Sequence, residues 1–248
     1  MEVWFYTLVS VFIVSLVSLV GIFAFSVNME KMEKALIYLV SLSVGTLLGG
    51  AFLHLIPEAF EGNSQKAPFY VLVGIILFFV LEKFIHWNHC HDSHCKEHSG
   101  RKKVFSYSIL IGDGLHNFID GMMIAASYLI SIPLGIVTTI AVIFHEIPQE
   151  IGDFGTLVYA GFSKAKALMF NFLSALTAIV GAVVVLVVGF NSEVADFLLP
   201  LTAGGFIYVA VADLIPELHK TPKARQSFWQ LVFLFIGLAI MAGLMYIE

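Results

Sequence analysis

Long apolar blocks constrain this chain more than any other feature. About 20 apolar residues suffice to cross the hydrocarbon core of a bilayer, and the sequence holds eight blocks of that length. Only 12% of the residues are charged, against about 25% in a typical soluble domain. Backbone groups in lipid must be hydrogen-bonded internally, so the blocks predict an all-α bundle of eight transmembrane helices. We expect them at 3–27, 35–57, 68–87, 104–129, 133–160, 165–190, 197–217 and 227–247.

Basic residues gather on one side of the predicted bundle. Twelve of the 13 Lys and Arg residues lie in or beside the first, third, fifth and seventh loops. Cytoplasmic loops of membrane proteins carry the excess of Lys and Arg. We therefore expect these loops in the cytoplasm and both termini outside, in an integral protein of the plasma membrane. The net charge of −5 gives no indication of a nucleic-acid partner.

Two segments share a pattern. GTLLGGAFLHLIPEA (45–59) ends the second predicted helix, and TAGGFIYVAVADLIPEL (202–218) ends the seventh. Each has a Gly-Gly pair and then a polar residue before Leu-Ile-Pro-Glu, His54 in one and Asp213 in the other. The loop count makes the copies inverted, as in a 3+2+3 arrangement that pairs helices 1–3 with helices 6–8. Inverted repeats are typical of secondary transporters; the alternative is that these short patterns simply recur in membrane helices.

The fourth predicted helix holds ionisable residues inside apolar sequence. In IGDGLHNFIDG (111–121), His116 and Asp120 are four residues apart. That spacing places both side chains on one face of a helix. Asn117 lies beside them, and Asp113 is about one turn earlier.

The fifth predicted helix repeats this arrangement around a proline. Pro148 has no N–H, so the carbonyl of Phe144 loses its helical hydrogen-bond donor. The segment HEIPQEIGD (145–153) contains two further pairs four residues apart: His145 with Gln149, and Glu146 with Glu150.

The two histidines are expected at the same depth. His116 is 11 residues from Phe105 at the inner end of its helix, which is about 16 Å at the helical rise. His145 is 11 residues from Leu134 at the outer end of the next helix, again about 16 Å. Imidazoles, carboxylates and amides near the midplane suit a borderline divalent cation such as zinc, and also iron, manganese or cadmium. A polar network between helices and a proton relay without metal are the alternatives.

These motifs resemble those of the ZIP family of divalent-metal transporters. They are most similar to the subfamily whose fourth helix reads GDGxHNFxDG and whose fifth reads HExPHExGD; here the segments are GDGLHNFIDG and HEIPQEIGD. The resemblance covers nearly the whole chain and implies one transporter domain over 1–248. It also implies a homodimer and movement of Zn²⁺, or the related ions Fe²⁺, Mn²⁺ and Cd²⁺, into the cytoplasm. It assigns metal ligation to His116, Asn117, Asp120, His145, Glu146 and position 149, and the helical spacing adds Glu150 to the predicted site.

The sequence departs from the family pattern at two positions. Gln149 stands where the subfamily has a second histidine. In NFLSALTA (171–178), Ala178 stands where some branches have a metal-binding glutamate, which leaves Asn171 and Ser174 as the polar groups. One bound metal and two bound metals both stay open.

A His- and Cys-rich segment links the third and fourth predicted helices. HWNHCHDSHCKEHSGRKK (86–103) has five histidines and both cysteines of the chain, and its polar part, 88–103, is the predicted cytoplasmic loop. Cytoplasmic thiols stay reduced, so we expect no disulfide. The loop is either a collector or sensor of metal or a solvated linker with incidental affinity.

The main competing function is enzymatic. An H-E-x-x-H motif on a membrane helix would indicate an intramembrane zinc metalloprotease with the glutamate as general base. Here Gln149 replaces the second histidine, so we expect no enzyme. A metal-gated sensor without transport is the other alternative.

Overall fold

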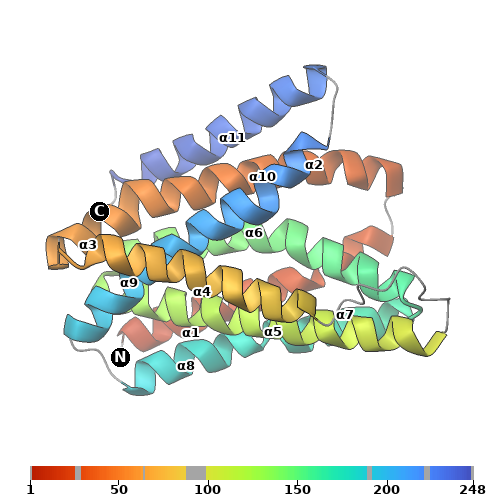
Figure 1. Ribbon diagram of the computed structural model, residues 1–248, viewed down its shortest axis with the longest axis horizontal. Coiled ribbons are helices and arrows are strands. Elements are labelled where there is room, and N and C mark those ends of the chain that lie inside the picture. Colours follow the sequence, from red (N-terminus) through yellow and green to blue (C-terminus); the bar gives the residue numbers. More distant parts are fainter. Residues whose placement is uncertain are drawn as a thin grey trace.

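The computed structural model describes residues 2–25, 29–63, 65–87, 99–188, 192–220 and 224–246, and every regular element in these ranges is helical. Figure 1 shows the helices running roughly along one direction as a bundle. Within the described residues, six helical segments are long and apolar enough to cross a membrane, which confirms the predicted all-helical membrane protein. These segments are Glu2–Gly21, Ala35–Glu61, Ile132–Val158, Lys164–Val188, Phe197–His219 and Ala224–Leu244.

The helices follow the predicted apolar blocks, but several blocks change helix type or break partway. The first continues from an α-helix into a 3₁₀-helix, the second and seventh contain a π-helix, and the sixth breaks at Leu176. The elements are α1 (Glu2–Val17), η1 (Ser18–Phe25), α2 (Met29–Gly49), η2 (Gly50–Leu55), α3 (Ile56–Asn63), α4 (Ala67–Trp87), α5 (Ser99–Ile130), α6 (Ile132–Tyr159), α7 (Lys164–Ala175), α8 (Thr177–Val188), α9 (Ser192–Tyr208), η3 (Val209–Leu214), α10 (Ile215–His219) and α11 (Ala224–Leu244).

The two π-helices occupy the same place in the two similar segments. Both η2 and η3 end directly before Ile-Pro-Glu, and in each the isoleucine N–H bonds to the carbonyl five residues back. Pro57 and Pro216 explain this, because a proline ring clashes with the carbonyl four residues earlier in an α-helix. A wider π-turn avoids that clash, and such turns are frequent at functional sites.

Close backbone contacts repeat with the same register. A Cβ added to Gly45 of α2 would lie 3.0 Å from Cα of Gly237 in α11, and one added to Gly204 of α9 would lie 3.0 Å from Cα of Gly74 in α4. Small residues allow this close helix packing in membranes. Gly45 and Gly204 each stand ten residues before their Leu-Ile-Pro-Glu. The structural counterpart of Gly204 is therefore Gly45, and the two Gly-Gly pairs of the sequence pattern are offset from each other.

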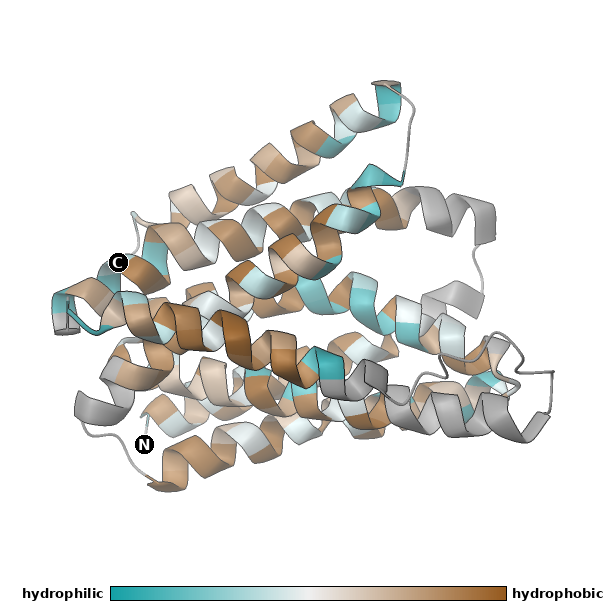
Figure 2. Ribbon diagram, viewed as in Figure 1, coloured by the Kyte–Doolittle hydropathy of each residue, from teal (hydrophilic) through white to brown (hydrophobic). Residues whose placement is uncertain are grey.

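The fourth and fifth predicted helices correspond to α5 and α6, which pack against each other inside the bundle (Figure 1). Figure 2 shows hydrophilic residues along the C-terminal half of α6, within an otherwise hydrophobic bundle. α5 begins at Ser99, so the last residues of the predicted 88–103 loop are helical. Residues 88–98 of that loop lie outside the described part of the chain.

Candidate metal centre

Two imidazoles and two carboxylates meet between α5 and α6. His116 and Asp120 extend from α5, and His145 and Glu146 from α6. The two Nε2 atoms are 3.3 Å apart. His145 Nε2 lies 3.3 Å from both Asp120 Oδ2 and Glu146 Oε1. His116 Nε2 lies 3.6 Å from the same Asp120 oxygen and 3.5 Å from the same Glu146 oxygen.

These separations match the edges of a zinc coordination shell. Zinc binds imidazole nitrogen and carboxylate oxygen at about 2.0 to 2.2 Å in a tetrahedron, whose edges are then about 3.3 to 3.6 Å long. Five of the six edges among the four ligand atoms measure 3.3 to 3.6 Å, and all four atoms lie within 4.8 Å of one another. Within the described residues, the carboxylate oxygens of Asp120 and Glu146 accept no hydrogen bond. The four side chains thus surround a position of the right size for a cation.

The orientation of His145 leaves its Nε2 atom available as a ligand. Its Nδ1 lies 3.2 Å from the carbonyl oxygen of Ala141. A carbonyl only accepts, so Nδ1 carries the proton of the neutral ring and Nε2 carries the lone pair. The ring of Phe206 packs edge-on at 6.2 Å between centroids. Such a hydrogen bond at the far nitrogen is what metal-binding histidines usually have.

A second group of carboxylates shares Glu146 with the first. Asp113, Glu146 and Glu150 are buried, and each offers an oxygen within 4.8 Å of the others. Asn117 donates to Asp113 at 2.9 Å, and Asn171 of α7 donates to Glu150. Within the described residues the Oδ1 atoms of both asparagines have no donor. This group offers oxygen ligands only, which suit harder cations than the histidine-containing group does.

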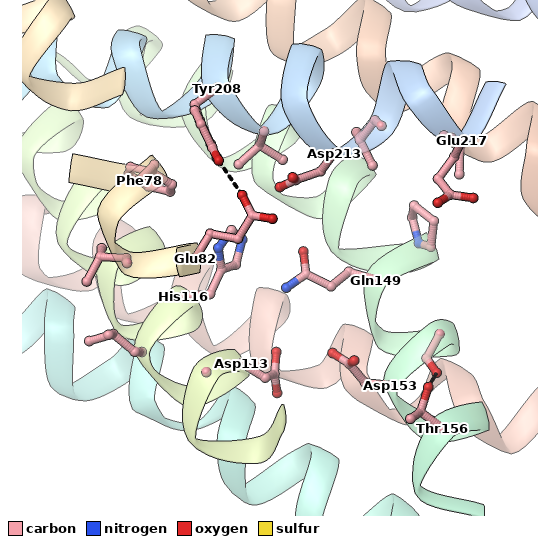
Figure 3. A pocket seen from close by; sticks show the side chains of 18 of the residues that line it. Phe78, Glu82, Asp113, His116, Gln149, Asp153, Thr156, Tyr208, Asp213 and Glu217 are labelled. Atoms are coloured by element: carbon pink, nitrogen blue, oxygen red, sulfur yellow. Dashed lines mark hydrogen bonds between the residues drawn. The ribbon is translucent and has the colours of Figure 1, made fainter. Parts of the chain in front are cut away.

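A cavity of about 750 Å³ adjoins the centre. His116, which is 17% exposed, lines it, whereas His145 is 2% exposed and lies behind it. Figure 3 shows acidic side chains from two walls of this cavity. Asp113 and Asp153 come from α5 and α6; Glu82, Asp213 and Glu217 come from α4, η3 and α10, with Tyr208 of α9 donating to Glu82.

The cavity lies in one half of the bundle. Its lining residues in α4 and α6 lie in the C-terminal halves of these helices, those in α2 lie toward its N-terminal end, and Glu217 lies in the short helix α10. These are the ends joined by the first, third, fifth and seventh loops. The path from the centre therefore leads toward the side that carries the basic residues.

The structure divides the predicted site residues among these features. His116, Asp120, His145 and Glu146 form the four-ligand group, and Glu150 joins the oxygen-only group. Asn117 turns toward Asp113, and Gln149 lines the cavity with His116 (Figure 3).

Some residues at the site were not part of the predicted set. The sequence pattern did point to Asn171 as a polar residue in an apolar helix, but it did not indicate the contact with Glu150. No periodic signal indicated Glu82 or Tyr208, because they come from helices distant in the sequence. Ala178, which the sequence comparison marked as a departure from the expected pattern, is fully buried.

The histidine of the repeated pattern is separate from the centre. His54 is buried, and its Nε2 lies 2.9 Å from the carbonyl oxygen of Met241 in α11. Its counterpart Asp213 lines the cavity. The two repeats thus differ in what they present at this position.

A helical membrane bundle with a buried histidine–carboxylate group joined to an acidic cavity is typical of integral membrane proteins that carry divalent cations. The family model described as ZIP Zinc transporter matches residues 1–102 and 87–245 of the chain. The chain belongs to the ZIP zinc transporter family.

Individual relatives agree with this family. The chain is 35% identical over 226 residues to Zinc transporter ZIP13 of Pongo abelii, which covers 82% of this chain and 65% of that protein. It is 35% identical over 250 residues to Zinc transporter YKE4 of Saccharomyces cerevisiae, covering 86% of this chain and 72% of that protein. It is 31% identical over 334 residues to Zinc transporter SLC39A7 of Mus musculus, covering 99% of this chain and 70% of that protein. Since these relatives are named as transporters, the intramembrane protease is not favoured.

Proposed function

We propose that the chain moves Zn²⁺ across a membrane toward the cytoplasm, with His116, Asp120, His145 and Glu146 as the central ligands. One observation carries this proposal: five of the six separations among the four ligand atoms from α5 and α6 are 3.3 to 3.6 Å, as in a zinc tetrahedron. Two nitrogen and two oxygen ligands suit zinc. Fe²⁺, Mn²⁺ and Cd²⁺ are included as related substrates, because a mixed nitrogen and oxygen set also accepts them.

The release path leads through the oxygen-only group and the cavity. Asp113 belongs to that group and also lines the cavity, and His116 of the four-ligand group lines the same cavity. An ion that leaves past His116 therefore enters a cavity whose wall includes the Asp113 carboxylate. Asn117 and Gln149 serve as weak oxygen ligands along this path, and Glu150 belongs to the second group. A neutral amide at position 149 binds zinc less tightly than an imidazole, which favours release.

The membrane arrangement follows from the same assignment. Both α4, with 21 residues, and α5, with 32, are long enough to span the bilayer. With them the chain has eight spans in the 3+2+3 arrangement, and the cavity opens to the cytoplasm. The repeated π-helices and glycine contacts support this arrangement. The homodimer, the plasma membrane and the outside termini stay predictions of the sequence.

Uptake of radioactive zinc into vesicles that contain the purified chain tests this function. The parent should show saturable uptake, and His145→Ala should lose most of it because a buried ligand is removed. His219→Ala is the matched control, since it removes an exposed imidazole that does not line the cavity. Uptake by correctly inserted His145→Ala at the parent rate would contradict the proposal. A sensor without transport would bind zinc but give no uptake by the parent.

A further inference from the structure

A backbone carbonyl next to the metal centre lacks its normal partner. In an α-helix the carbonyl of Phe144 would accept from the N–H of residue 148, but Pro148 has none. The hydroxyl of Ser43, in α2, lies 2.5 Å from this carbonyl oxygen and donates to it. α2 and α6 pack against each other, so the bond crosses between two helices of the bundle (Figure 1).

The Ser43 hydroxyl also has a second acceptor within reach. Its oxygen lies 2.8 Å from the carbonyl of Leu39 in its own helix. The Leu39 carbonyl already has a helical donor, the N–H of Ser43, because both residues lie within α2. The Phe144 carbonyl lacks such a donor, and leaving a buried acceptor unsatisfied is costly. The Ser43 hydroxyl is therefore expected to donate to the Phe144 carbonyl of α6.

Neighbouring hydroxyls do not make this bond. Ser41 is buried in the same helix, and the only bond that the described residues show for its hydroxyl is to Ile37, at 2.8 Å. Thr202 stands twelve residues before its Leu-Ile-Pro-Glu, as Ser43 does, and bonds to Leu198 of its own helix at 2.8 Å. α5 contains no proline in its sequence, whereas α6 does. The bond between helices thus occurs where a proline has removed a donor.

We infer that Ser43 is a positioning residue for the metal centre. Its hydroxyl supplies the hydrogen bond that Pro148 withholds and holds the peptide that directly precedes His145 and Glu146. Those two residues provide two of the four ligand atoms, so a rotation of this peptide displaces both. The inference rests on the proposed function, because it concerns the same zinc site. It adds a residue from α2, which contributes no ligand to that site.

Zinc affinity of the purified full-length chain, measured by competition with a chromophoric chelator, tests this role. We expect Ser43→Ala to weaken zinc binding about tenfold, which corresponds to about 1.4 kcal/mol. Ser43→Thr keeps a hydroxyl and should stay within about threefold of the parent, about 0.7 kcal/mol. Ser41→Ala, which loses only a bond within its own helix, should bind zinc like the parent.

A double-mutant cycle separates positioning from general stability. Pro148→Ala restores the backbone N–H, so the Phe144 carbonyl regains a donor within α6. In that background Ser43→Ala should change zinc affinity by less than about twofold, because the hydroxyl is no longer needed. Thermal unfolding of each variant identifies any that fail to fold.

The outcomes are distinct. Parent-like affinity of folded Ser43→Ala, or an equal loss in both backgrounds, overturns the role of Ser43. If the Ser43→Ala single variant does not fold, the zinc affinity of Pro148→Ala is compared with that of the double variant. A much weaker affinity of the double variant would contradict the role of Ser43. Absence of zinc binding by the parent would overturn the proposed function instead.

Discussion

The Nε2 atoms of His116 and His145 face each other at 3.3 Å, although the residues are 29 positions apart and in different helices. Their surroundings differ. His145 is sealed behind the cavity and is held through its Nδ1 by the Ala141 carbonyl, whereas His116 is 17% exposed and lines the cavity. In the proposed site, His145 is therefore the fixed ligand, and His116 lies where an ion would enter or leave.

Replacing the sealed imidazole should change which ion is preferred. His145→Glu converts the mixed set into one with more oxygen, and oxygen ligands suit harder ions such as Mn²⁺. We expect competitive flux in vesicles to shift from zinc toward manganese by roughly tenfold, equivalent to about 1.4 kcal/mol. His219→Glu is the control and should leave the ratio unchanged. An unchanged zinc-to-manganese ratio in inserted His145→Glu would mean that His145 does not select the ion.

The oxygen-only group should bind a hard cation separately from the histidines. Asp113→Asn or Glu150→Gln removes one carboxylate charge from three that lie together. Each should therefore abolish one equivalent of bound Mn²⁺, measured by electron paramagnetic resonance, while one equivalent of zinc remains. Glu61→Gln, at an exposed position of α3, provides the control. Full manganese binding by both variants would show that these carboxylates hold no cation.

The central part of this site could be predicted from sequence. Spacings of four residues placed His116 with Asp120 on one face, and equal depth placed His145 beside them. The spacing is a local property of one helix, and the depth follows from counting residues along two consecutive helices. The pairing of Asn171 with Glu150 could not be predicted in the same way, because it depends on how α7 is rotated against α6. The hydrogen bond from Ser43 could not be predicted either. Pro148 showed that a carbonyl of its helix lacks its donor, but not which other helix supplies one.

The fold, like the site, could be predicted from the sequence only in part. The apolar blocks predicted the long helices, and the shared Leu-Ile-Pro-Glu pattern indicated that two segments are similar. The π-turns themselves were not predicted, because their register depends on which carbonyl escapes the proline ring. The equivalence of Gly45 and Gly204 in the two segments became clear only from their contacts with Gly237 and Gly74.

Helix packing offers a matched test within α11. A Cβ at Gly237 would clash with the backbone carbonyl of Leu42 in α2, whereas a Cβ at Gly243 would have no neighbour within 4 Å. Alanine normally favours a helix over glycine by up to about 1 kcal/mol. Gly237→Ala should therefore lower the thermal unfolding temperature in detergent by several degrees, and Gly243→Ala should leave it unchanged or raise it. Equal unfolding temperatures for both variants would contradict the close packing of α2 and α11.

Chemical labelling tests the orientation. The basic loops predict that Cys90 faces the cytoplasm and that Ser192, at the start of α9, faces outside. An impermeant thiol reagent should label Ser192→Cys in intact cells that carry the protein at their surface. Cys90 should react only after the cells are made permeable. Labelling of Cys90 in sealed cells would reverse the assigned topology.

X-ray absorption at the zinc edge, on the purified chain loaded with one equivalent of zinc, tests most directly whether zinc binds between His116 and His145. We expect four ligands at about 2.0 to 2.2 Å, with the outer-shell scattering of two imidazoles. In His145→Ala that signal should fall to one imidazole, while His219→Ala should match the parent. A first shell of oxygen alone, or two imidazoles retained in His145→Ala, would show that zinc does not bind between His116 and His145.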